Sequence, residues 1–434
     1  MVQIKENMVN IEIGKSDDKI SKKLGVFYNP IMKFNRDCSV LLLNALDSLR
    51  KKKDINVTEY DCGLTIGLPL SGSGIRGLRF LKELNKNIIK EIHFNDYKDD
   101  FNVLMKNNIK INKVHYEPEK LSDNNKNNHN IINIHNKEAN LFLHQSSGFD
   151  YIDIDPFGTP NPFLDNAVKR ISRAGILAIT ATDTSALAGT YPKACKRKYF
   201  AVPLRIYLMH ELGIRILIRK VQLIGAQYDK ALIPIFTYAK DHYYRIFFRC
   251  EKGKTKVDEV LKQHKYFLYC NKCMNFFVDM FNKHDCGICN RNKTKKEHDK
   301  IENSNKQMIY AGPLWVGKLF DKNVVRKMKR QDYIKVIKQE DNETQSRENI
   351  RFFEMLCEEA LAGIDNNCNG DCIVGFYEIP EVMKMFKIGD SIKLNELMDG
   401  LKKRKYKVVR THFGKQAVKS DCGVDDIIEV MRER

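Results

Sequence analysis

The run of residues 153–160 constrains the fold of this 434-residue chain more than any other feature. It overlaps an alternating apolar stretch, Phe149–Ile154, which predicts a β-strand. Two prolines and a glycine end that strand abruptly. The carboxylate of Asp155, followed by a proline and an aromatic ring, is therefore expected at the carboxyl end of a buried strand, where open α/β sheets bind ligands. The alternative is a strand end and a Pro-Phe turn in which Asp155 is only a cap.

Strand and helix patterns alternate on both sides of this run, which predicts a doubly wound, mostly parallel α/β sheet. The first apolar segment stops at a glycine-rich turn, and the last two strands form a pair that would close the sheet. The expected strands cover 64–70, 91–94, 175–182, 231–238 and 243–250, and the expected helices cover 39–51, 98–112 and 202–223.

The last third of the chain predicts a smaller α+β module with winged-helix-like character. Residues 327–363 have helical periodicity, and 377–411 combine helices with a strand-like segment at 406–410. We expect one domain at 1–255 and a second at 256–434, the latter holding this module at 320–434. Two segments poor in apolar residues are expected to be solvated insertions, 122–137 and 290–306.

The charge balance predicts a polyanionic partner. The chain has 74 basic and 55 acidic residues, a net charge of +19. Neutralisation of phosphates by Lys and Arg drives nucleic-acid binding, so such an excess favours an RNA or DNA ligand. The basic runs 196–198 and 402–405 are candidate phosphate contacts. The alternative is a lysine-biased composition without a partner, in which both runs are solvated faces.

Cysteine usage and hydropathy predict the compartment. No apolar stretch approaches the length needed to span a membrane, and the N-terminus lacks an apolar signal region. Twelve cysteines at irregular spacing favour a reducing environment. We expect a cytoplasmic protein that does not contact membranes. A monomer is expected, and no protein partner is implied.

The turn at 71–74, Ser-Gly-Ser-Gly, opens a helix directly after a strand, and its glycines allow a ligand to approach the backbone closely. Its spacing matches neither the dinucleotide fingerprint nor a P-loop, which disfavours pyrophosphate. Asp96 ends the next strand, where an acid commonly binds ribose hydroxyls. A nucleoside without phosphates fits both features, so S-adenosylmethionine is the expected cofactor. Turn capping is the alternative role for Asp96. Glu138 and Ala139, in the expected next strand region, could flank the adenine or be structural only.

Two Cys-x2-Cys knuckles, twelve residues apart, predict a tetrahedral zinc site within 264–292. Four thiolates leave no position for water, so the metal would be structural. Disulfides are the alternative, which a reducing compartment disfavours, and His284 is expected to be a bystander. The expected ligands are Cys270, Cys273, Cys286 and Cys289.

These features together resemble the tRNA (guanine-26-N2)-dimethyltransferase family, and its archaeal members most. The Asp-Pro-Phe-Gly and Gly-Pro-x-Trp runs are the most specific points of resemblance. The matching segments are 26–30, 34–37, 74–79, 95–96, 153–160, 180–183, 196–199, 312–317 and 410–413. The resemblance implies a Rossmann-like class I methyltransferase domain and a C-terminal domain that helps to hold tRNA.

The resemblance also implies roles for individual residues. Asp155, with Pro156, would hold the guanine amino group, and Phe27 and Phe157 would pack on the base. The residues implied to contact S-adenosylmethionine are Arg36, Arg76, Asp96, Glu138 and Ala139. From the residues alone, either arginine could instead be an ordinary ion-pair partner, and Phe27 could belong to the core.

The resemblance implies methylation of guanine N2. From the residues alone, a carboxylate that accepts an amino N–H can make such a nitrogen more nucleophilic on any base that carries one. The target base must leave its stack to reach such a site. Two alternatives remain at this stage. One is methylation of another exocyclic amino group, such as adenine N6, and the other is a zinc-stabilised RNA-binding protein without activity.

Overall fold

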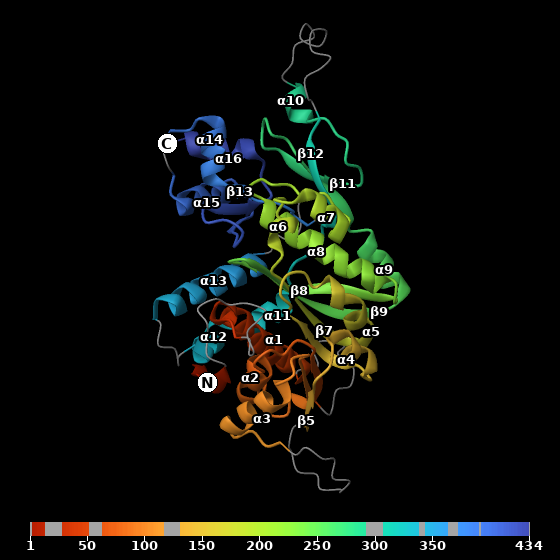
Figure 1. The fold of residues 1–434 in the computed structure, drawn as a ribbon. Helices are drawn as coiled ribbons and strands as arrows, with labels where there is room; N and C mark the ends of the chain where they lie inside the picture. The colour runs from red at the N-terminus through yellow and green to blue at the C-terminus, as the bar shows by residue number, and fades with distance from the viewer. Residues whose placement is uncertain are drawn as a thin grey trace.

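A computed structural model describes residues 2–13, 28–51, 63–116, 131–291, 307–337, 343–362, 372–389 and 392–433 (Figure 1). The described residues build one large mixed sheet, two three-stranded sheets, a two-stranded hairpin and the helices that pack with them. None of the described helices is both long enough and apolar enough to cross a membrane.

A seven-stranded sheet forms the centre of the fold, with strand order β5-β4-β3-β6-β7-β9-β8. Its strands are parallel except β9, which runs antiparallel to both of its neighbours. The predicted doubly wound sheet with a closing strand pair is therefore confirmed. The strands are β3 Leu64–Leu68, β4 Ile89–Asn95, β5 Ile131–His135, β6 Phe149–Ile154, β7 Ile171–Ala181, β8 Lys230–Lys240 and β9 Tyr243–Lys252.

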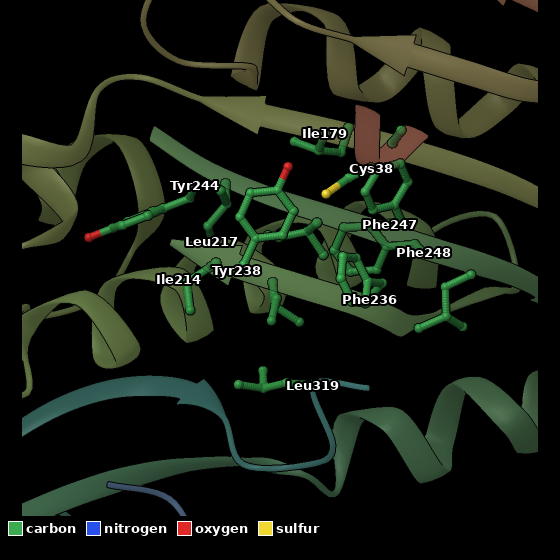
Figure 2. Close-up of a cluster of buried hydrophobic side chains, with 14 of the residues drawn as sticks. Cys38, Ile179, Ile214, Leu217, Phe236, Tyr238, Tyr244, Phe247, Phe248 and Leu319 are labelled. Carbon is green, nitrogen blue, oxygen red and sulfur yellow. The ribbon is translucent and has the colours of Figure 1, made fainter. Parts of the chain in front are cut away.

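Helices cover both faces of the large sheet. Figure 2 shows Cys38 and Tyr238 on one side of the strands and Ile214 and Leu319 on the other, so side chains fill both interfaces. The helices of this part are α1 Lys33–Lys51, α2 Ile75–Glu83, α3 Phe101–Ile111, α4 Ala139–Gln145, α5 Leu164–Arg170, α6 Thr184–Leu187, α7 Pro192–Tyr199, α8 Met209–Ala226 and α9 Lys254–Leu261. Two 3-10 turns, Pro30–Met32 and Asn161–Phe163, and an N-terminal hairpin of β1 Val2–Glu6 and β2 Val9–Ile13 complete it.

Two sequence predictions fail within this region. The expected insertion 122–137 contains β5, whose Ile132 is buried and whose register on β4 is regular. The strand itself is not Asn-rich, because it contains Ile131, Ile132 and Ile134, and its one asparagine, Asn133, donates to Glu91 at 2.6 Å. Glu138 and Ala139 also start a helix, α4, rather than lying in a strand. Residues 122–130 and 292–306 of the expected insertions lie outside the described residues.

The periodicity predicts a helix that begins at residue 202, but helix α8 begins at Met209. Pro203 lies just ahead of it, and a proline restricts the residue before it to extended backbone. That residue, Val202, exchanges backbone hydrogen bonds of 2.8 Å with Gly312. A long-range β-bridge thus replaces the first expected helical turns.

The remaining described residues form two small antiparallel sheets and seven more helices (Figure 1). One sheet has the order β11-β10-β12, with β10 His264–Tyr269, β11 Phe276–Asp279 and β12 Ile309–Trp315, next to α10 Gly287–Arg291. The other has the order β13-β15-β14, with β13 Tyr377–Glu378, β14 Val408–Arg410 and β15 Ala417–Ser420. The C-terminal helices are α11 Lys322–Lys327, α12 Arg330–Ile337, α13 Glu343–Leu361, α14 Ile379–Phe386, α15 Leu394–Lys403 and α16 Val424–Arg432. The predicted α+β character is confirmed.

Candidate active site and metal centre

A cleft opens where β3 and β6 end and α2 begins. Its position at the carboxyl ends of parallel strands is the one predicted for a binding site. The side chains at its wall include Tyr28, Arg36, Leu68, Leu70, Ser73, Ile75, Arg76, Asp153 and Asp155.

The glycine turn forms one wall of this cleft, and its geometry needs glycine. Gly72 and Gly74 have φ of +55° and +76°, in the left-handed region that disfavours side chains. A Cβ on Gly74 would lie 2.3 Å from the sulfur of Met105. Gly72 N–H donates to Asp96 Oδ2 at 2.9 Å, so the expected acid lies directly against the turn. Burial raises the pKa of Asp96, against the opposing hydrogen bonds from backbone N–H groups.

The polar and apolar groups around the turn fit a nucleoside. Among the described residues, the buried hydroxyl of Ser73 has no hydrogen-bond partner, and Leu68, Leu70 and Ile75 supply apolar wall. The described wall contains no lysine for a phosphate. A carboxylate, an unsatisfied hydroxyl and apolar surface suit ribose hydroxyls and a purine ring better than a phosphate chain.

Arg76 joins Asp153, near the end of β6, to Asp155, the first residue after the strand. Arg76 Nη2 donates to Asp155 Oδ2 at 2.5 Å, and its Nη1 lies 3.5 Å from Asp153 Oδ2. The side chain of Asp153 is 2% exposed, whereas that of Asp155 is 21% exposed. One buried acid therefore fixes the arginine, and one acid faces the cleft.

A buried network behind Asp153, absent from the sequence predictions, holds this arrangement. Arg245 of β9 donates to both oxygens of Asp153 at 2.9 and 2.7 Å, and Tyr151 donates to Asp153 at 2.5 Å. Ser39 of α1 accepts from Arg245 at 3.0 Å and from Arg76 at 2.9 Å. Burial raises the pKa of Asp153, but Arg245 and Arg76 outweigh it and the net pKa is lowered. The sequence signal that could have revealed this network is Arg245, a charged residue at an inward position of the apolar strand expected at 243–250.

Arg36 lines the cleft, yet its guanidinium is engaged by an acid. It donates to both carboxylate oxygens of Glu6, at 2.8 and 2.5 Å, and to the carbonyl of Asn29 at 3.0 Å. Arg79 also donates to Glu6, at 2.8 Å. Burial raises the pKa of Glu6, but the two arginines outweigh it and the net pKa is lowered. The ion-pair interpretation therefore describes Arg36 in the structure, and cofactor contact stays a prediction.

The loop after β6 presents Pro156 and Phe157. Pro156 is buried, and Phe157 is 40% exposed. Gly158 N–H donates to Thr182 Oγ1 at 2.7 Å, and Thr182 N–H donates back to the Gly158 carbonyl at 2.9 Å. These contacts fix the loop beside the cleft with an aromatic ring on its surface. Phe27, the other expected base contact, lies outside the described residues.

Glu138 and Ala139 lie at the same edge of the sheet, at the start of α4. The Glu138 carboxylate caps this helix by accepting the N–H of Leu141 at 3.0 Å, and Ala139 is buried. Asn95, at the end of β4, accepts from the N–H of Lys137 at 3.1 Å. This bond ties the segment to the end of β4, next to Asp96, but contact with an adenine stays a prediction.

The four expected cysteines converge on one point. Their sulfurs all lie within 4.8 Å of one another, with Cys273 and Cys286 at 3.4 Å and Cys270 and Cys289 at 3.8 Å. All four are free thiols, and the cluster excludes His284. Sulfurs bound tetrahedrally to zinc at 2.3 Å would be about 3.8 Å apart, so these residues fit the metal.

We expect the purified protein to contain one structural zinc ion per chain, detected by elemental analysis. Cys289→Ser should lose the metal, because a tetrahedral site with a missing thiolate binds zinc far more weakly. Cys357→Ser, which changes a free cysteine outside the cluster, is the matched control and should retain it. Wild-type protein that contains no zinc, and in which all four cysteines of the cluster react as free thiols, would contradict the assignment.

Known proteins that resemble this chain support the methyltransferase interpretation of the site. A sequence model of the family described as "N2,N2-dimethylguanosine tRNA methyltransferase" matches residues 6–432. The chain is 34% identical to the tRNA (guanine(26)-N(2)/guanine(27)-N(2))-dimethyltransferase of Aquifex aeolicus, over 99% of this chain and 95% of that protein. It is 35% identical to the tRNA (guanine(26)-N(2))-dimethyltransferase of Pyrococcus furiosus, over 94% of this chain and 93% of that protein.

A solved structure extends this likeness to the fold. The structure of Trm1 from Pyrococcus horikoshii in complex with S-adenosyl-L-methionine has a TM-score of 0.73 and 30% identity, over 99% of both chains. This likeness confirms the class I methyltransferase architecture predicted from the motifs. Because the family match spans almost every residue, the chain belongs to the N2,N2-dimethylguanosine tRNA methyltransferase family.

Proposed function

We propose that this protein transfers methyl groups from S-adenosylmethionine to N2 of guanine 26 in tRNA, giving N2-methylguanosine and N2,N2-dimethylguanosine. The observation that carries the proposal is the Asp155 carboxylate, which faces the cleft between the glycine turn and the loop of Phe157. The names of the relatives from Aquifex aeolicus and Pyrococcus furiosus support guanine 26 as the target.

The cofactor would lie along the glycine turn. Asp96, which accepts the Gly72 N–H, would also accept the ribose hydroxyls, and Glu138 and Ala139, at the start of α4, would border the adenine. Arg76 and Arg36 would meet the methionine end, where both line the cleft. When bound, S-adenosylmethionine supplies an electrophilic methyl group on a sulfonium.

Asp155 would make the guanine amino group reactive. The lone pair of that nitrogen is shared with the ring, so the free amine is a poor nucleophile. An N–H bond to the second carboxylate oxygen of Asp155, with another to the Pro156 carbonyl, would localise the lone pair. Arg76 holds the first oxygen at 2.5 Å and thereby orients the carboxylate. Asp155 would also accept the proton that the amine loses.

The base must leave the tRNA stack to reach Asp155, which costs a few kcal/mol. The exposed ring of Phe157, held by the anchored loop, offers a surface on which the flipped base can stack. Phe27 would supply the second ring. Exclusion of water from this space would strengthen the hydrogen bonds that Asp155 makes.

We further propose that residues 1–255 form the catalytic domain and 256–434 a tRNA-binding domain, with the zinc site at 264–292 and the α+β module at 320–434. Support comes from the large sheet, whose last strand ends at Lys252. The two parts pack closely, since α11 contacts α1. A monomeric, cytoplasmic enzyme is the corresponding working hypothesis.

The test uses unmodified tRNA transcripts and cofactor labelled in its methyl group, followed by nucleoside mapping. We expect label in N2-methylguanosine and N2,N2-dimethylguanosine at position 26, and none at this position in a transcript with adenosine there. Label in N6-methyladenosine, or RNA binding without transfer, would support the two alternative functions instead.

A further inference from the structure

A groove lies between the end of α7 and the sheet that carries the zinc site. Figure 1 shows α7 next to this sheet. The side-chain walls of the groove are Lys196 and Phe200 from one side, and Tyr266, Asn282 and Tyr310 from the other. The β-bridge between Val202 and Gly312 ties the two sides together. We call this set of residues the α7–β12 groove.

Phe200 is held in the groove in an unusual conformation. Its φ of +54° and ψ of +41° are left-handed, which bulky residues avoid. The ring is nevertheless 64% exposed, and the ammonium of Lys220 lies 4.8 Å from its centroid. Neither burial nor backbone preference explains a phenylalanine here, and such outliers concentrate at functional sites.

The zinc centre supports the opposite wall. Tyr266 and Tyr310 meet edge to face, with centroids 5.8 Å apart. Both rings pack on the small core formed around Cys270, Cys286 and Leu268. The position of these two rings therefore depends on the four-cysteine cluster. A structural zinc ion held by that cluster would thus stabilise one wall of the groove.

The charge of the groove is positive. Lys196 lines it, Lys220 covers the Phe200 ring, and no acidic residue is among the described side chains that line it. Arg219 of α8 lies near Tyr266. Within the described chain, its buried Nε and Nη1 atoms have no hydrogen-bond partner. Aromatic faces interleaved with cations form the surface that single-stranded nucleic acids bind.

Hydrogen bonds connect α7 to the loop of the candidate active site. Tyr199, the residue before Phe200, shares a hydrogen bond of 2.9 Å with Thr159 in the loop after Asp155. Asn161 of the same loop donates to the Lys198 carbonyl at 3.0 Å. Helix α7 thus connects the place where a base would be methylated to the aromatic groove.

We propose that the α7–β12 groove binds an unstacked nucleotide of the tRNA near the methylated one. Its base stacks on Phe200 and the tyrosine wall, and its phosphates lie at Lys196 and Lys220. This inference rests on the proposed function, because it identifies where the same substrate strand continues. It also assigns the zinc site the role of fixing half of the groove.

Phe200→Asn tests the stacking. Asparagine tolerates the left-handed conformation well, so the variant should fold with unchanged or raised thermal stability. Its Kd for an unmodified tRNA transcript, measured by fluorescence anisotropy, should rise roughly 5- to 100-fold, and KM for tRNA should rise with it. Binding of S-adenosylmethionine, measured by calorimetry, should not change.

Phe281→Ser is the matched control, because Phe281 is a 72% exposed ring on the same zinc segment that does not line the groove. It should bind tRNA as wild type does.

Lys196→Gln combined with Lys220→Gln should reduce the slope of log Kd against log salt by about 0.7 for each phosphate that the variant no longer neutralises. Equal losses of affinity in the Phe200 and Phe281 variants would contradict the groove.

Failure of this inference is distinct from failure of the proposed function. Wild-type protein that methylates tRNA, with a Phe200→Asn variant of unchanged Kd and KM, would refute the groove and leave the enzyme intact. Wild-type protein that binds tRNA through Phe200 but transfers no methyl group would refute the function alone.

Discussion

Replacing Asp155 by alanine is expected to abolish methyl transfer to tRNA and to leave cofactor binding almost unchanged. The carboxylate is the group that would accept the amino N–H and then the proton, and such positioned groups contribute about 10²–10⁴-fold. The kcat should therefore fall by about 1000-fold or more, measured with labelled cofactor. The fold should persist, because Arg76 keeps its bond of 2.9 Å to Ser39 and its approach to Asp153.

Two further variants sharpen this experiment. Asp155→Asn keeps the shape and one acceptor oxygen but cannot take a proton, so it should remain strongly impaired. Asp165→Ala removes an exposed acid of α5 that pairs with Lys169, and it should keep full activity. Substantial transfer by Asp155→Ala would remove this residue from the mechanism.

Replacing Arg245 by leucine should cause the largest loss of stability, about 3–5 kcal/mol, because it removes one partner of a buried ion pair. Arg245 and Asp153 are both fully buried, and their two hydrogen bonds join β9 to β6. Without the guanidinium, the buried Asp153 retains Arg76 and Tyr151 as partners among the described residues. Urea unfolding followed by circular dichroism measures the change.

Lys256→Gln provides the control for this measurement. It breaks an exposed ion pair with Glu251 and should change stability by no more than about 0.5 kcal/mol. If Arg245→Leu cost no more than this control, the buried network would not be what holds Asp153 and, through Arg76, Asp155.

Much of the fold was predictable because local patterns agreed with the tertiary structure. The alternating run before Asp155 and the apolar segment before the glycine turn both became parallel strands of the central sheet. The two Cys-x2-Cys knuckles specified the cysteine cluster directly, since their spacing has few other uses. Local signals of this kind do not depend on distant parts of the chain.

The errors arose where distant residues decide the outcome. Strand β5 was missed because the Asn-rich residues before it masked its short apolar run, Ile131, Ile132 and Ile134, which pairs with β4, far back in the chain. Val202 pairs with Gly312, more than a hundred positions away, so the expected helix begins late. The same limit applies to the site, since the partners of Asp155 and Arg36 come from α2 and β1.

Methyl transfer to a tRNA transcript with inosine in place of guanosine 26 tests the central claim most directly. Inosine lacks the exocyclic amino group and is otherwise the same base, so the tRNA should bind with similar affinity. Our account predicts full labelling of the guanosine transcript at position 26 and no labelling of the inosine transcript there. Equal methylation of the two transcripts at that position would contradict it, because Asp155 would then have no amino group to hold.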